Sequence, residues 1–169
     1  MDVLYAPWRF SYIKSTVSEE PKACIFCEAP KKSDEEALIL LRGEYVYAIM
    51  NLYPYNTGHV MIVPYRHISD YTELSVDEAL EMHKMTIAVI EAIKELLKPH
   101  GFNLGFNIGR VAGAGIDKHI HLHIVPRWNG DTNFMPIIGG VKVLSQDVKE
   151  TYRSLKPLAE KYWHQRGNK

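Results

Sequence analysis

Short runs of apolar, aromatic and β-branched residues, separated by turns rich in Pro, Gly and Asn, predict the β-strands of this chain. The predicted strands are residues 38–41, 45–50, 59–63, 104–108 and 119–125. Several of them follow one another through short connections, which favours antiparallel pairing. With the helical segments between and after them, their order indicates an α+β fold, an antiparallel sheet with helices on one side of it.

Helical periodicity marks a central and a C-terminal segment. Ser75 and Glu78 fit a capping box, in which Ser75 accepts from the helix backbone and Glu78 reaches back, so one long helix is predicted to begin there. Its apolar face recurs at three- and four-residue spacing and consists of Leu80, His83, Ile87, Ile90, Ile93 and Leu97. We therefore expect His83 to be a core histidine. Residues 145–169 predict a C-terminal helical tail, which Pro157 should kink or restart.

The composition limits the classes of function. The 169 residues suit one domain over 1–169, in which residues 1–22 form an N-terminal arm of aromatic residues and turn formers. The 20 basic residues balance the 20 acidic ones, which argues against binding nucleic acid or an anionic membrane by bulk charge. The chain has neither an apolar run of membrane-spanning length nor a signal peptide, so we expect a cytoplasmic protein.

The most informative pattern is a row of histidines in the last predicted strand. Side chains alternate between the two faces of a strand, so His119, His121 and His123 share one face while the apolar residues between them point into the core. An exposed polar face is one interpretation, but stability gives no reason to choose histidine for it. Two chemical interpretations remain, a metal site and covalent catalysis by a neutral imidazole. His121, with a histidine on either side, is the candidate nucleophile.

The loop before this strand consists mostly of small residues. They are Gly109, Ala112, Gly113, Ala114 and Gly115. Small residues let backbone N–H groups approach an anion closely, and Arg110 and Lys118 bracket the loop with positive charge. A glycine-rich loop alone is also typical of a flexible turn, and no Walker sequence follows it. Beside aligned histidines, however, it favours phosphate chemistry.

Cys24 and Cys27 have the spacing of metal ligands. Two cysteines supply only half of a zinc site, so histidines would have to complete it. A redox pair is an alternative, although no thioredoxin-like pattern surrounds the cysteines, and a pair of buried free thiols is another. The 2 cysteines of the chain are too few for a disulfide framework.

The segment His-Ile-His-Leu-His-Ile-Val-Pro-Arg, residues 119–127, resembles the signature of the histidine triad (HIT) family. Most of the chain shares in this resemblance, through residues 24–27, 51, 58–64 and 107–109. Residues 5–9 and 125–136 resemble a prokaryotic branch that includes diadenosine tetraphosphate phosphorylases and hydrolases. The resemblance implies an α+β sheet with helices, usually in a homodimer, and nucleotidyl transfer as the chemistry.

The resemblance also implies a role for each histidine of the triad. In the family, the middle histidine attacks the α-phosphate and forms a nucleotidyl-histidine, which water, or phosphate in the phosphorylases, then cleaves. Here this residue is His121. His123 would contact the phosphate or the leaving group, and His119 would help to orient His121. The implied substrates are dinucleoside polyphosphates, such as diadenosine tri- or tetraphosphate.

Nucleotide-binding residues follow from the same resemblance. Asn51 matches the residue that binds the ribose hydroxyls, and the loop with Gly113 and Gly115 would lie at the phosphates, beside Asn107 and His123. Many related members have a glutamine where this chain has Gly115, and that glutamine helps to hold the polyphosphate. Its absence leaves room for a different acceptor, such as phosphate.

Zinc-bearing HIT relatives complete a four-ligand site with a histidine just after the third strand and the first histidine of the triad. The matching ligand set here is Cys24, Cys27, His67 and His119. A site with four protein ligands is closed, so the zinc would be structural and would tie the N-terminal segment to the catalytic strand. No organic cofactor is expected.

Other functions remain open from the sequence. A phosphoramidase of the Hint type would prefer adenosine phosphoramidates to dinucleoside polyphosphates. A metal-dependent hydrolase would hold a catalytic metal with the histidine cluster and lose activity reversibly on chelation. A nucleotide-binding module would bind its ligand without turnover. The expected partners are a small nucleotide and a second copy of the chain, with neither nucleic acid nor membrane.

Overall fold

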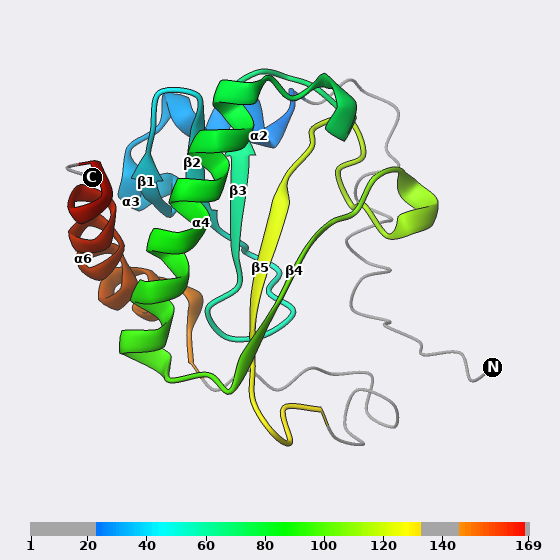
Figure 1. Cartoon of the computed structure of the whole chain (residues 1–169). Helices are drawn as coiled ribbons and strands as arrows, with labels where there is room; N and C mark the ends of the chain where they lie inside the picture. The colour runs from blue at the N-terminus through cyan, green and yellow to red at the C-terminus, as the bar shows by residue number, and fades with distance from the viewer. Residues whose placement is uncertain (1–22, 133–145, 168–169) are drawn as a thin grey trace.

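The chain folds around a five-stranded antiparallel sheet in the order β1-β2-β3-β5-β4 (Figure 1). The strands are β1 (Ile39–Arg42), β2 (Val46–Met50), β3 (Val60–Pro64), β4 (Gly101–Phe106) and β5 (Leu122–Arg127). The computed structural model describes residues 23–132 and 146–167, so the expected arm over 1–22 lies outside the described residues. The predicted α+β class and the antiparallel sheet are confirmed.

Two long helices accompany the sheet. α4 (Val76–Leu97) begins with the predicted capping box, because Ser75 and Glu78 each accept from the backbone of the other. α6 (Val148–Gly167) is the predicted C-terminal helix. The shorter elements are α2 (Ile25–Glu28), η1 (Ala29–Lys31), α3 (Asp34–Ala37), η2 (Tyr71–Glu73) and η3 (Arg110–Ala112). Within the described residues, every helix is too short or too polar to cross a membrane.

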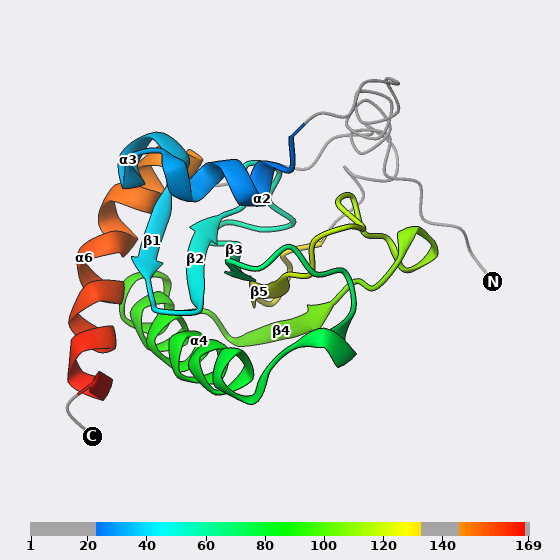
Figure 2. The same cartoon turned by 90° about the horizontal axis from the view of Figure 1, so that it is seen from above.

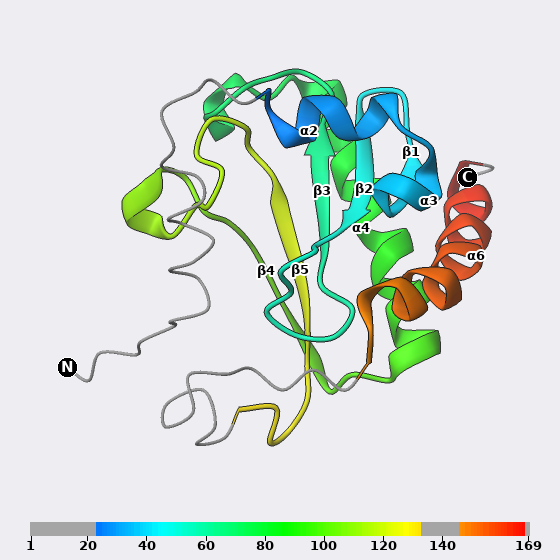
Figure 3. The ribbon, with the colours of Figure 1, turned by 180° about the vertical axis from the view of Figure 1, so that it is seen from behind.

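The helices lie on both faces of the sheet. α4 and α6 pack on one face, and α2 lies on the opposite face, as the view from above shows (Figure 2). The view from behind places α2 in front of the strands (Figure 3). The prediction of helices on one side is therefore wrong for α2. The reason is that β2 and β3 are apolar on both faces, so the second face also needs a cover.

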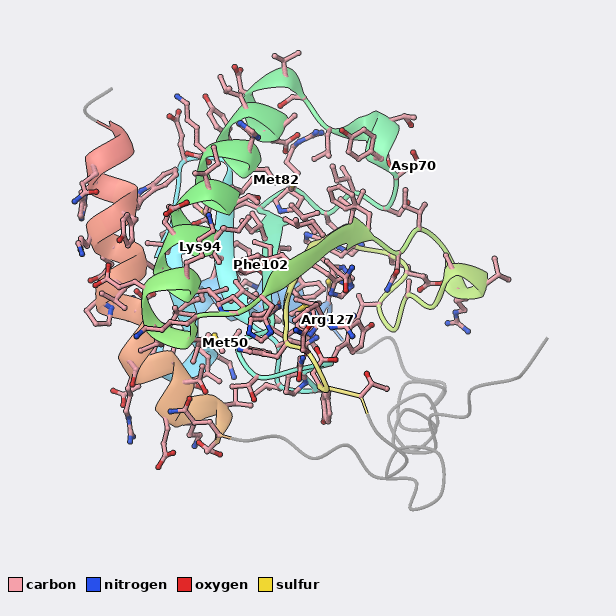
Figure 4. All side chains as sticks on the ribbon, turned by 60° about the horizontal axis from the view of Figure 1, so that its bottom comes forward. Met50, Asp70, Met82, Lys94, Phe102 and Arg127 are labelled. Carbon is pink, nitrogen blue, oxygen red and sulfur yellow. The ribbon has the colours of Figure 1, made fainter. Side chains whose placement is uncertain are left out.

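The buried face of α4 overlaps the predicted face only in part, because Ile93 is buried and Ile90 and Leu97 pack against the core. His83 is exposed, and 51% of Leu80 is accessible to solvent. Ile93 is buried as predicted, and the other buried apolar side chains are Met82, Met85, Ala88, Val89 and Ala92. Small alanines let the helix approach its neighbours closely, so the face of α4 that packs on the core is not the one with the largest apolar residues. Met82 belongs to this core, and Phe102 of β4 packs against it (Figure 4).

The predicted restart at Pro157 does not occur, because α6 continues through this residue. Proline has no N–H with which to bond the carbonyl one turn earlier, which weakens a helix at that point. Leu155 and Ala159, on either side of Pro157, are fully buried in the core with α4. Packing therefore holds the parts of α6 before and after Pro157 on the core.

β5 is shorter than the histidine pattern predicts. Its ladder with β4 ends at the pair Phe106 and Leu122, so His123 is the one histidine of the triad within the strand. His119 and His121 precede the strand in irregular backbone. Backbone carbonyls in this segment lie outside the ladder, where a side chain can bond to them.

We expect Glu78 to make the stability of the fold depend on pH. The Arg66 guanidinium, 2.7 Å away, and the backbone N–H of Ser75 donate to this buried carboxylate and hold the pKa of Glu78 at about 2, below its ordinary 4.5. Its stabilisation is therefore complete above pH 4.5 and is lost as the pH falls toward 2. In urea denaturation, Glu78→Gln should lower the free energy of unfolding by about 2 kcal/mol at neutral pH and by less in acid. Equal losses under both conditions would contradict this linkage.

Candidate active site

The three histidines of the triad are buried together on the face that α2 covers. His119, His121 and His123 are 0%, 6% and 7% exposed. The rings of His121 and His123 meet edge to face with centroids 4.7 Å apart, and the ring of Phe26 from α2 lies 4.8 Å from that of His121. The interpretation as an exposed polar face is therefore wrong.

The imidazole of His121 is held in one tautomer. Its Nδ1 lies 2.8 Å from the backbone carbonyl oxygen of His119, and because a carbonyl can only accept, Nδ1 carries the proton and donates it. The other nitrogen, Nε2, keeps its lone pair. Burial lowers the pKa of His121 more than the bond to His119 raises it, so the ring is neutral at pH 7. A neutral imidazole with an unprotonated Nε2 can act as a nucleophile.

A fourth histidine, His59, orients His123. The backbone N–H of Tyr55 donates to Nδ1 of His59 at 3.0 Å, so the proton of His59 lies on Nε2. This Nε2 donates to Nδ1 of His123 at 2.9 Å, which leaves the proton of His123 on its own Nε2. Burial, and then the neighbouring histidines, lower the pKa of His59 well below its ordinary value and keep it neutral. Nε2 of His123 can therefore donate a hydrogen bond beside the ring of His121.

The sequence pattern does not reveal the role of His59. In the sequence, His59 stands between Gly58 and an apolar strand, within the segment that resembles the HIT family. The structure adds that its imidazole is fully buried. Its partner His123 is 64 residues away, so only the pairing of β3 with β5 shows that the two rings meet.

A cavity of about 370 Å³ lies beside the two imidazoles. His121 and His123 line it, together with residues of α2, of β2 and of the loop after β2. Its large apolar lining residues include Ile25, Phe26, Ile49, Met50, Leu52 and Met61. An apolar cavity with a few polar groups fits a small molecule that has a flat apolar part and a polar end.

The residues expected to bind nucleotide lie around this site at different distances. Asn51 and Gly115 line the cavity. Nδ2 of Asn107 lies 3.5 Å from Nε2 of His123, although Asn107 is not among the lining residues. Gly113 does not line the cavity either, and ends η3 with a φ of 91°.

In the loop before the histidines, the glycines allow a tight turn, and Arg110 lies outside the cavity lining. The Arg110 guanidinium donates to the carboxylate of Asp117 at 2.9 Å and does not line the cavity. Gly109 and Gly113 flank η3 with φ values of 79° and 91°, which glycine adopts at little cost. The structure therefore does not place Arg110 at the cavity, where it was expected to contribute charge to a phosphate site.

Cys24, Cys27, His67 and His119 form a second cluster, with ligand atoms all within 4.8 Å of one another. Nδ1 of His119 lies 3.3 Å from Sγ of Cys24, and Nδ1 of His67 lies 3.3 Å from Sγ of Cys27. Nε2 of His119 donates to the carbonyl of Pro64 at 2.9 Å, which keeps the proton away from the Nδ1 that faces the cysteines. These four residues could hold a metal ion, and their donor set suits Zn²⁺.

Together these features define a class of protein. An unprotonated imidazole nitrogen and a hydrogen-bond donor lie side by side at an apolar cavity, and these are the groups that a group-transfer enzyme needs at its site.

Comparison with known proteins gives the family. The model of the HIT domain matches residues 32–130. The chain is 45% identical over 158 residues to a protein of Mycobacterium tuberculosis named AP-4-A phosphorylase, with 90% of this chain and 81% of that protein covered. The chain therefore belongs to the HIT family, and its enzymatic relatives agree with the site.

Solved structures show the same fold. A Zn-bound histidine triad family protein from Mycobacterium smegmatis matches with a TM-score of 0.66 at 26% identity, over 82% of this chain and 94% of that one. A hypothetical histidine triad nucleotide-binding protein from Sulfolobus tokodaii matches with a TM-score of 0.64 at 28% identity, over 84% of this chain and 93% of that one.

Proposed function

We propose that this HIT enzyme cleaves dinucleoside polyphosphates by nucleotidyl transfer through His121. The observation that carries the proposal is the fixed tautomer of His121, whose unprotonated Nε2 belongs to a ring at the wall of the cavity. The 45% identity to a protein named AP-4-A phosphorylase supports a diadenosine polyphosphate as substrate.

In the first step, Nε2 of His121 attacks the α-phosphorus, and the bond from that phosphorus to the bridging oxygen breaks. The electron pair leaves with the oxygen, which accepts a hydrogen bond from Nε2 of His123. With diadenosine tetraphosphate the leaving group is ATP, and AMP remains bound to His121. In the second step the acceptor attacks the same phosphorus and releases the imidazole.

The remaining site residues have supporting roles in this proposal. Asn51, at the cavity wall, would hold the ribose hydroxyls. Asn107 would bind a phosphate oxygen together with Nε2 of His123, from which its amide is 3.5 Å away. Gly115 and Gly113 would let the backbone approach the phosphate chain closely. His119 orients the nucleophile through its carbonyl.

We infer that phosphate, rather than water, is the preferred acceptor. Gly115 lines the cavity and has no side chain, so space is left at the position where many relatives have a glutamine. The name of the 45% identical relative agrees with a phosphorolytic reaction.

Product analysis tests both parts of this proposal. Incubation with diadenosine tetraphosphate and phosphate should yield ATP and ADP, whereas without phosphate the slower products should be ATP and AMP. Phosphate labelled with ¹⁸O should place its label in the β-phosphoryl group of ADP. Equal yields of AMP under both conditions would identify a hydrolase, and cleavage of adenosine phosphoramidates alone would identify a phosphoramidase.

Zinc is the metal we propose for the second cluster. Cys24, Cys27, His67 and His119 would bind it as thiolates and neutral imidazoles. Four protein ligands leave no open position, so the ion would serve structure rather than bind substrate. A reducing compartment such as the cytoplasm would keep both thiols available, and we propose that location.

We propose a homodimer that forms through β4. This strand lies at the edge of the sheet, and its sequence Gly-Phe-Asn-Leu-Gly-Phe contains none of the charges or prolines that usually protect an edge. Leu104 on β4 is 48% exposed, and Tyr71 and Ile108 nearby are 52% and 43% exposed. Light scattering should report twice the chain mass of 19.4 kDa, and a Leu104→Lys variant should shift it toward the monomer. A monomeric wild-type chain would contradict this interface.

A further inference from the structure

α2 carries Phe26 between the two cysteines of the cluster and places its ring on the catalytic histidines. Phe26 is 2% exposed. Its ring centroid lies 4.8 Å from that of His121 and 5.5 Å from that of His119. A rigid ring at this distance limits the rotation of the His121 imidazole, so it favours the orientation in which Nδ1 meets the carbonyl of His119.

His119 joins the cluster to the nucleophile through two different groups. Its ring Nδ1 lies 3.3 Å from Sγ of Cys24 and 3.6 Å from Sγ of Cys27. Its backbone carbonyl accepts from Nδ1 of His121 at 2.8 Å. The position of the His119 ring therefore influences the acceptor that fixes the tautomer of His121.

Besides the cluster, α2 is held mainly by the packing of Phe26 in the smaller core on this face of the sheet. It has 4 residues, and Phe26 is its one buried side chain. An isolated helix needs about 12–15 residues to be even marginally stable. Outside the cluster, a bond from the Tyr47 hydroxyl to the carbonyl of Phe26 also holds it, at 2.6 Å. Ile25, Phe26 and Glu28 nevertheless line the cavity, so one wall of the site depends on this short helix.

The main core of the fold does not depend on α2. The larger cluster of buried side chains lies on the other face of the sheet, between the strands, α4 and α6, and contains no residue of α2. Loss of order at α2 should therefore damage the site long before it unfolds the chain.

We propose that the segment Cys24–Cys27 positions the nucleophile: metal binding at the cluster fixes the tautomer and orientation of His121 and holds the cavity wall in place. Phe26 and His119 are the positioning residues. This inference rests on the proposed role of His121 as nucleophile. It assigns the cluster an effect on the chemistry, although none of the four ligands needs to touch the substrate.

The test compares Cys27→Ser with a matched core variant, Leu155→Ala, which lowers stability on the opposite face of the sheet. Zinc content, AMP affinity by calorimetry and the tautomer of His121 by ¹⁵N NMR are measured on the full chain. Cys27→Ser should lose zinc, bind AMP at least tenfold more weakly and show mixed His121 tautomers. Leu155→Ala should unfold at a lower temperature but keep zinc, AMP affinity and a single tautomer.

A second variant keeps the proposal testable if Cys27→Ser does not fold. Phe26→Leu retains all four ligands, so it should keep zinc while the His121 tautomers become mixed and nucleotidylation slows severalfold. A single tautomer in zinc-free Cys27→Ser, or in Phe26→Leu, would overturn the proposal. AMP binding and the tautomer need no turnover, so these results stand apart from failure of the chain to cleave dinucleoside polyphosphates.

Discussion

Replacement of His121 by alanine should abolish turnover of diadenosine tetraphosphate. The substitution removes the nitrogen that forms the covalent bond, and loss of a nucleophile of this kind lowers kcat by about 10⁴-fold or more. The fold should survive, because His121 lies outside the β5 ladder and the main core is on the other face of the sheet. Rate measurements with product identification check the loss.

His83→Ala is the matched control for this prediction, because His83 is an exposed histidine on α4, away from the cavity lining. It should keep the wild-type rate. Rapid-quench mass spectrometry should then detect the chain with one added AMP in the wild type and in His83→Ala, but not in His121→Ala. A substantial residual rate in His121→Ala would assign the covalent step to another residue.

Local rules predicted the elements of the fold but not which faces they bury. The capping box at Ser75 and Glu78 marks the start of α4 because it depends on neighbours along the chain. The buried face of α4 depends on what packs against it, and there Ala88 and Ala92 matter more than the exposed Leu80. For the same reason, the sequence did not predict that α2 covers the second face of the sheet.

The histidine row predicted that three imidazoles lie together on one side of the chain, because alternation is a local property of an extended chain. The tautomers could not be predicted in this way. They depend on the carbonyl of His119, which is available because β5 begins only at Leu122, and on His59, which a neighbouring strand brings to His123. Long-range contacts of this kind have no periodic signature in the sequence.

The cluster of Cys24, Cys27, His67 and His119 was predicted partly from spacing and partly from the resemblance. The spacing of Cys24 and Cys27 indicates half of a site, and spacing alone could not select the other ligands. The resemblance named His67 and His119, and the fold brings all four ligand atoms together. Neither spacing nor resemblance indicated a role for Phe26, whose ring contacts both His119 of this cluster and His121.

Replacement of His59 by phenylalanine should slow the cleavage of diadenosine tetraphosphate by about 10²-fold, the lower range for loss of a hydrogen-bond donor to developing negative charge. The ring shape is kept, but His123 loses the donor that holds its proton on Nε2. The backbone N–H of Tyr55 also loses its acceptor in the buried site, so stability should fall by about 1–3 kcal/mol. Rates are therefore compared well below the unfolding temperature.

The leaving group separates an effect on His123 from general damage to the site. The phenyl ester of AMP releases a more basic anion than the p-nitrophenyl ester, so its cleavage depends more on a donor at the leaving oxygen. His59→Phe should therefore slow the phenyl ester more than it slows the p-nitrophenyl ester. If both substrates slow to the same extent, His59 supports the structure of the site and does not act through the proton of His123.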